Sequence, residues 1–175
     1  MTNLLELGCW DKAGNIRVVV EAPKGSTAKF KYDPALAAFE LQRFIGDAGY
    51  PYHWGFVPST QAADGDPLDA LVIDDSVTWP GVIIPSIAIG LLKIAETPDG
   101  AAEPRRNDRM IAVPSARQTL HSVNELSSQQ RAALERFFVA TGELAKKRVV
   151  VEGWGDPGDA SVALRSAHAE YSNKR

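Results

Sequence analysis

The hydrophobic pattern of the chain changes its period about two thirds of the way along, and this change limits the folds that the sequence can adopt. Before residue 114, apolar residues occur in short runs between turn residues, which is typical of strands. After residue 127, they recur at the spacing of a helix. We therefore expect an α+β protein that is predominantly β, in which a strand-rich barrel or sandwich has helices added late in the chain.

Six short runs are predicted to form strands, because they are mostly apolar and are bounded by turn residues. They are Ile16–Ala22, Ala28–Tyr32, Ala70–Asp74, Ile83–Ile94, Met110–Val113 and Val149–Glu152. The stretch from Thr97 to Asp108 is polar and contains proline and glycine, so we expect an exposed loop there.

Two helices are predicted in the last third of the chain. Ser127 and Gln130 fit the Ser-x-x-Gln capping box, which places a helix at about 127–146. A second helix is predicted to begin at Asp156 and Pro157, since proline is favoured at the first helical position. Small and apolar residues then recur on one face of this helix, so we expect that face to be buried.

The composition indicates a single domain over residues 1–175. Of these residues 45% are hydrophobic, enough for one substantial core. The net charge is only −3 with both signs interspersed, which argues against a nucleic-acid or membrane partner. One cysteine, Cys9, excludes an internal disulfide and a cysteine-built zinc site. The first ten residues do not resemble a signal peptide, so we expect a soluble, cytoplasmic protein.

The segment Asp64-Gly65-Asp66-Pro67-Leu68-Asp69 is the part of the sequence that most suggests chemistry. Gly65 and Pro67 force a turn that crowds three carboxylates together, immediately before an apolar strand. Crowded like charges cost free energy unless a cation or a proton neutralises them, and oxygen ligands suit magnesium or manganese rather than zinc. Taken by itself, the segment fits either a metal site or a solvated acidic turn.

Two other motifs are excluded by spacing and order. A calcium EF-hand loop counted from Asp64 would need an oxygen ligand, a glycine and a glutamate where the chain has Leu68, Asp69 and Asp75. Phosphatases with an aspartyl nucleophile carry Asp-x-Asp after a hydrophobic strand, whereas here the strand follows the aspartates. The segment therefore matches neither of these motifs.

The acidic segment resembles the signature of the soluble inorganic pyrophosphatases, which is Asp-x-Asp-Pro-x-Asp followed by an apolar strand. The resemblance covers most of the chain, in the order of the family. Its other parts are Val18–Ser26, Lys29, Arg43, Tyr50-Pro51, Met110–Pro114 and Val151–Trp154.

This resemblance implies a five-stranded OB-like barrel with two or more helices packed outside. It also implies a magnesium-dependent enzyme that hydrolyses inorganic pyrophosphate to two phosphates, and a homo-oligomer, either a hexamer or a dimer. The positions that match metal ligands are Asp64, Asp66, Asp69, Glu21 and Glu96. Asp66 also matches the catalytic carboxylate that takes a proton from a metal-bridging water. The positions that match phosphate-binding residues are Lys29, Arg43, Tyr50 and Arg109.

Several positions depart from the family pattern within the expected site. They are Lys31 for a glutamate, Trp54 for a tyrosine, Thr97 for a glutamate, Asn107 for an aspartate, Arg109 for a lysine, and Thr141-Gly142 for a tyrosine-lysine pair. Asp108 adjoins Asn107, but neighbours on an extended chain point to opposite faces, so Asp108 should face away from the site.

These departures make the site less acidic. We hypothesise that it holds fewer metal ions than a typical family member, with Lys31 and Arg105 or Arg106 replacing part of their charge. They also leave two alternatives to pyrophosphate hydrolysis. One is action on another phosphate or phosphonate compound, for which Thr141-Gly142 would make room, and the other is a non-catalytic role in binding or assembly.

Overall fold

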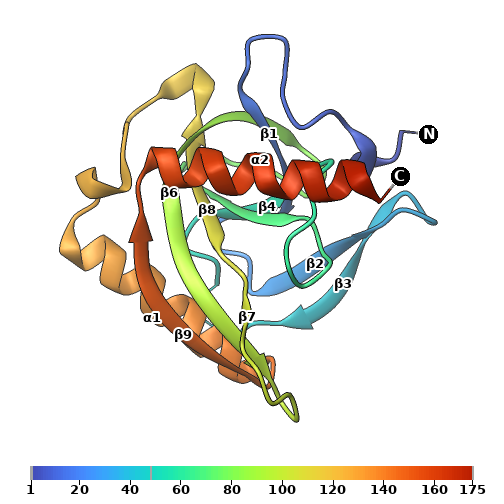
Figure 1. Ribbon diagram of the computed structural model, residues 1–175. Helices are drawn as coiled ribbons and strands as arrows, with labels where there is room; N and C mark the ends of the chain where they lie inside the picture. Colours follow the sequence, from blue (N-terminus) through green and yellow to red (C-terminus); the bar gives the residue numbers. More distant parts are fainter. Residues whose placement is uncertain (1, 48, 175) are drawn as a thin grey trace.

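Figure 1 shows the computed structural model, which describes residues 2–47 and 49–174. The strands are β1 (Ile16–Ala22), β2 (Ala28–Asp33), β3 (Ala38–Phe44), β4 (His53–Val57), β5 (Leu68–Val72), β6 (Ile83–Pro98), β7 (Arg105–Arg106), β8 (Arg109–Pro114) and β9 (Lys147–Gly155). The α-helices are α1 (Ser128–Leu144) and α2 (Pro157–Asn173), and the short 3-10 helices are η1 (Leu4–Glu6), η2 (Ser115–Arg117) and η3 (Val123–Glu125).

Five strands close into a ring in the order β1, β4, β5, β8, β6. The ring closes because β6 pairs with β1 as well as with β8. Only the pairing of β5 with β8 is parallel; the other pairings in the ring are antiparallel. Closure pairs both edges of every strand in the ring. The predicted predominantly β fold with a five-stranded OB-like barrel is confirmed.

The strands of the ring are buried on both faces. Leu71 and Ile111 belong to one apolar cluster, to which α1 contributes Phe138. Val72 and Ala112, one residue further along each strand, belong to a second cluster, to which α2 contributes Leu164. Because side chains alternate between the two faces of a strand, burial of both faces gives continuous apolar runs in the sequence.

Both predicted helices are confirmed with their caps. Ser127 Oγ accepts a hydrogen bond from Gln130 N at 3.1 Å, and Gln130 Oε1 accepts one from Ser127 N at 2.9 Å, which completes the capping box. Asp156 caps α2 and Pro157 is its first residue. Figure 1 shows α2 lying across the barrel and α1 beside β9. Within residues 2–47 and 49–174, no helix is long and apolar enough to cross a membrane.

Three strands, β3, β4 and the two-residue β7, were not predicted. β3 is mostly exposed and pairs only with β2, in a hairpin outside the ring. β4 contains Gly55, which weakens a strand pattern in the sequence. Close packing explains why this position is a glycine, because a Cβ at Gly55 would lie 1.9 Å from the carbonyl oxygen of Val19. Only glycine allows β1 and β4 to approach this closely.

The strands β6 and β9 are longer than the sequence predicts. β6 continues to Pro98 because β9 pairs with it along its whole end, from Leu91 opposite Gly155 to Pro98 opposite Lys147. The loop expected from Thr97 to Asp108 is shorter than predicted. β6 extends into it as far as Pro98, and β7 turns back to pair with β6. These additions extend the sheet beyond the ring and form one side of the cleft described next.

Candidate active site

Every residue that the sequence matched to a metal-binding, catalytic or phosphate-binding position lies around one cleft between the barrel, the β2–β3 hairpin and the C-terminal end of α1. The cleft consists of a cavity of about 90 Å³ and an adjoining one of about 460 Å³, which share Lys29, Arg43, Asp66, Asp69, Ala145 and Lys147. The smaller cavity is also lined by Tyr50, Asp64, Glu96 and Arg109, and the larger one by Glu21. Folding therefore brings together residues that are far apart in the chain.

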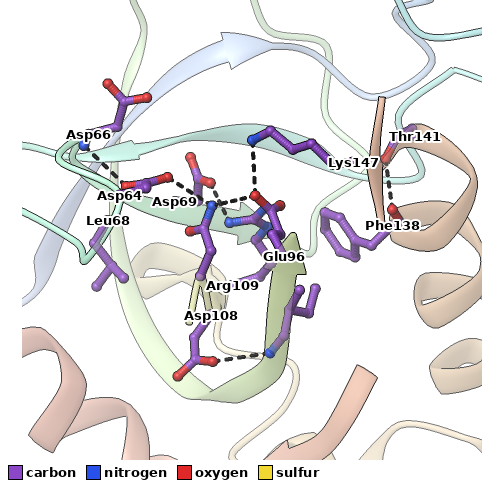
Figure 2. Close-up of polar contacts among 12 residues, drawn as sticks. Asp64, Asp66, Leu68, Asp69, Glu96, Asp108, Arg109, Phe138, Thr141 and Lys147 are labelled. Carbon is purple, nitrogen blue, oxygen red and sulfur yellow. Dashed lines mark hydrogen bonds and ion pairs between the residues drawn. The ribbon is translucent and has the colours of Figure 1, made fainter. Parts of the chain in front are cut away.

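The acidic loop between β4 and β5 is a tight turn. Asp64 Oδ1 accepts a hydrogen bond from Asp66 N at 3.1 Å, and Gly65 has φ 93°, a backbone conformation that favours glycine. Figure 2 shows this bond and the three carboxylates of the loop. Asp66 is the most exposed of the three carboxylates, and Lys31 Nζ lies 3.0 Å from its Oδ1. The loop thus presents its acids to the cleft from a tight turn.

Arg109 lies between two carboxylates at the base of the cleft. Its Nη1 donates to Asp69 Oδ2 at 2.6 Å, and its Nη2 forms a shorter ion pair with Glu96. Asn107 Nδ2 bridges Asp64 at 2.8 Å and Glu96 at 3.1 Å. These contacts join the acidic loop to the end of β6 and hold Arg109 in place; Figure 2 labels Arg109 with its partners Asp69 and Glu96.

Glu96 and Asp69 respond to this environment in opposite directions. Burial acts to raise the pKa of Glu96, but Arg109, Lys147 and the Asn107 amide outweigh it and lower the pKa. Burial raises the pKa of Asp69 in spite of Arg109 and Lys29. Glu96 is thus stabilised as a carboxylate by its neighbours, whereas the negative charge of Asp69 is only partly compensated.

Glu21 is a buried carboxylate with little compensation. Burial, and then repulsion by Asp69, raise its pKa to about 7. Its one hydrogen bond in the described chain, from Tyr32 N, is long at 3.4 Å. Burial also lowers the pKa of Lys29, against the attraction of Asp69 and Glu21. Burial therefore disfavours the charged forms of Glu21 and Asp69, and a bound cation would stabilise them.

The metal-free protein is expected to lose stability as the pH rises toward 7. Because the pKa of Glu21 is about 7 when folded and near its usual value of about 4.3 when unfolded, the folded state holds an extra proton between these values. The stabilising contribution is complete below about pH 4 and is lost as the pH passes 7. The free energy of unfolding, measured in urea with a chelator, should fall by roughly 2 kcal/mol between pH 5 and 8. An unchanged slope in Glu21→Gln would contradict this assignment.

Aromatic rings form the wall beside the cations. Tyr50 stacks on Trp54 with ring centroids 5.8 Å apart, and the Arg109 guanidinium lies 5.4 Å from the Trp54 ring. Burial raises the pKa of the Tyr50 hydroxyl, so this group is neutral at physiological pH. In the part of the chain that the structure describes, Arg43 Nε, Trp54 Nε1 and Arg109 Nε are buried without a hydrogen-bond acceptor. Unpaired donors around one cavity suit an anion.

Some of the positions that depart from the family pattern lie in the cleft, and others lie outside it. Lys31 and Asn107 both reach the cleft, as expected. Asp108 faces away from it, as predicted: it accepts a hydrogen bond from Ile94 N and pairs with Arg106 at 2.7 Å. The expectation that Arg105 or Arg106 supplies charge to the site is wrong, because Arg106 lines a separate cavity beside α2 with Asp108, and Arg105 lines neither cavity of the cleft.

One cation of the cleft, Lys147, was missed. It is the first residue of β9, and its Nζ lies 2.9 Å from Glu96 Oε2, as Figure 2 shows. The sequence offers Lys146, Lys147 and Arg148 in a row, and charge alone does not distinguish them. The register of β9 against β6 decides which of the three faces the cleft.

The residues of the cleft fit a hard divalent cation. All the candidate donors are carboxylate oxygens, which suit magnesium and manganese. Burial raises the pKa values of Glu21 and Asp69, although Lys29 opposes the shift of both and Arg109 opposes that of Asp69, so a metal ion would stabilise their charged forms. Among residues 2–47 and 49–174, however, no group of three or more His, Cys, Asp or Glu side chains is arranged so that it could hold a metal ion. Asp64, Asp66 and Glu96 instead contact Asn107, Lys31 and Lys147.

Comparisons with known proteins agree with this geometry. Residues 18–172 match the model of a protein family described as inorganic pyrophosphatase. The chain is 37% identical over 149 residues to the inorganic pyrophosphatase of Synechocystis, covering 83% of this chain and 85% of the relative. It is 35% identical over 179 residues to that of Thermus thermophilus, covering 98% and 99%. The crystal structure of an inorganic pyrophosphatase from Thermus thermophilus superimposes with a TM-score of 0.86 at 34% identity, covering 98% of this chain and 99% of that one. The chain belongs to the inorganic pyrophosphatase family.

Proposed function

We propose that this protein hydrolyses inorganic pyrophosphate to two phosphates. The observation that carries the proposal is the arrangement of opposite charges in one cleft: the acidic loop lies on one side, and Lys29, Arg43 and Arg109 lie around it. Cleavage of a compact polyanion requires cations that bind its outer oxygens and carboxylates that hold metal ions. The similarity to the named pyrophosphatases supports the same activity.

The candidate metal ligands are Asp64, Asp66, Asp69, Glu21 and Glu96, which would hold magnesium or manganese. Such ions, when bound, supply an activated water and neutralise the charge of the phosphates. Asp66 is proposed to accept the proton of that water, because it is the exposed carboxylate at the tip of the acidic loop. The ion pair of Lys31 with Asp66 supports the hypothesis of fewer metal ions, since a cation already lies beside this carboxylate.

The phosphate groups are proposed to bind Lys29, Arg43, Tyr50 and Arg109. Arginine offers a planar fork and lysine a point charge. The Tyr50 hydroxyl, kept neutral by burial, adds one uncharged donor. Arg109 is fixed by Asp69 and Glu96, so it needs no rearrangement to receive a phosphate. A homo-oligomer and a cytoplasmic location are likewise proposals from the resemblance.

Release of phosphate from pyrophosphate tests this function. The wild-type protein with magnesium should release two phosphates per pyrophosphate, and a chelator should abolish the reaction. A panel of nucleotides and phosphonates should give less than about one hundredth of that rate, because Arg109 and Tyr50 line the smaller cavity, of about 90 Å³, which limits the size of the bound compound. Activity confined to the panel would support the alternative substrate class. If the folded protein releases phosphate from none of these compounds, the result would support a non-catalytic role.

The structure offers little for the alternative substrate class. Gly142 does not leave open room in the cleft, because Val149 Cγ2 would lie 2.2 Å from a Cβ placed there. The space of the missing side chain is therefore filled from β9. Pyrophosphate remains the substrate that the site fits best.

A further inference from the structure

The wall that α1 contributes to the cleft has no cation. Thr141 Oγ1 donates to the carbonyl of Phe138 within the helix at 3.3 Å, which Figure 2 also shows. Gly142 has no side chain, and Val149 leaves no space for one. Ala145, one turn further along, is apolar. A phosphate group on this side of the cleft would meet no positive charge from the helix.

Lys147 supplies positive charge on this side from a different element. It lines both cavities of the cleft together with Ala145. Its ammonium group lies 2.9 Å from Glu96 Oε2, and its side chain is 37% exposed. Arg109, by contrast, is 8% exposed and is held by two carboxylates. Lys147 is therefore a cation of the cleft that solvent, and hence a ligand, can reach.

The contact between Lys147 and Glu96 is easily exchanged. Without Lys147, Glu96 still accepts hydrogen bonds from Arg109 and Asn107, so no buried carboxylate is left unpaired. A partly exposed ion pair contributes little to stability, because water screens it. A charge-assisted hydrogen bond to a multiply charged phosphate is stronger. The lysine stem has four rotatable bonds, which allows its head to move within the cleft.

We propose that Lys147 is a substrate-binding residue, whose ammonium group exchanges Glu96 for an outer phosphate oxygen of pyrophosphate. This inference rests on the proposed function and adds a ligand to it. Glu96 serves as the resting partner that keeps the ammonium group inside the cleft. The start of β9 thus provides the positive charge that the end of α1 lacks.

The matched variants Lys147→Met and Lys146→Met test this inference. Both remove one positive charge, but Lys146 is exposed outside the cleft. Lys147→Met is expected to raise KM for magnesium pyrophosphate about tenfold, the loss of one charge-assisted hydrogen bond, with kcat within about threefold. Lys147→Arg should restore most of the affinity, and Lys146→Met should match the wild type. The affinity for methylenediphosphonate, measured by calorimetry in the presence of magnesium, should fall by the same factor in Lys147→Met and should not change in Lys146→Met.

The two readouts separate this inference from the proposed function. Equal KM and equal methylenediphosphonate affinity in Lys147→Met and the wild type would overturn the role of Lys147 while hydrolysis stands. A wild type that hydrolyses no pyrophosphate would overturn the proposed function, and weaker methylenediphosphonate binding in Lys147→Met would still support Lys147 as an anion ligand. A loss of kcat and of the unfolding midpoint that Lys147→Arg does not rescue would show a structural role instead, and would also overturn the inference.

Discussion

The variant Asp66→Asn is expected to fold like the wild type and to hydrolyse pyrophosphate about 1,000-fold more slowly, the range of a lost general base. An amide has the size of the carboxylate but cannot take up the proton of an attacking water. The side chain is 58% exposed, so its replacement disturbs no packing. The lost ion pair with Lys31 is also exposed and contributes little to stability. Phosphate release at saturating magnesium measures kcat, and urea unfolding measures stability.

Asp75→Asn is the control for this experiment. Asp75 is another exposed aspartate that pairs with a lysine, Lys24, but it lies outside the cleft. Its variant should keep the wild-type kcat. If Asp66→Asn retains more than about one tenth of the wild-type kcat, Asp66 is not the base, because a general base contributes at least about 100-fold.

Arg109→Met is expected to lower the free energy of unfolding by about 3 kcal/mol, near the lower end of the cost of breaking a buried ion pair. The change leaves Asp69 and Glu96 near each other without the cation between them. The loss stays at the lower end because Lys147 and Asn107 still contact Glu96. Since protonation relieves the repulsion of the carboxylates, the difference from the wild type should shrink at pH 4 to 5. Urea unfolding at both pH values measures it.

Arg106→Met is the matched control for Arg109→Met. Arg106 also pairs with a carboxylate, Asp108, but its side chain is 62% exposed. Asp108 is itself buried, but it still accepts a hydrogen bond from Ile94 N, so the loss of Arg106 should cost about 1 kcal/mol, less than the loss of Arg109. Equal destabilisation by the two variants would show that Arg109 does not act as a buried counter-ion. Arg109→Lys should fall between them, because lysine keeps the charge and loses the fork.

Local signals in the sequence explain which elements could be predicted. The capping box at Ser127 and the aspartate and proline at 156–157 identified both helix starts, because capping involves residues close together in the chain. β4 could not be predicted, since Gly55 is there for its close approach to Val19, a long-range contact. The end of β6 could not be predicted either, because pairing with β9 extends it.

The acidic segment shows where prediction of the site succeeds and where it stops. Its residue types and spacing indicated carboxylates on a tight turn, and the structure has that turn. The partners of those carboxylates come from other parts of the chain: Lys31 of β2 for Asp66, Asn107 between β7 and β8 for Asp64, and Arg109 of β8 for Asp69. Three basic residues in a row at 146–148 gave no sign of which one enters the cleft. The register of β9 made that selection.

The sequence by itself determined the family, the succession of strands and then helices, and the hard-oxygen character of the site. These depend on residue type and on spacing along the chain, which the sequence contains in full. Only the tertiary structure decided the charge balance of the cleft: Glu21 is raised in pKa by burial beside Asp69, Arg106 is directed away, and Lys147 is brought to Glu96. Burial and distances between charges arise when separate strands pair. Coulomb energies depend on those distances, so the balance could not be obtained from the sequence alone.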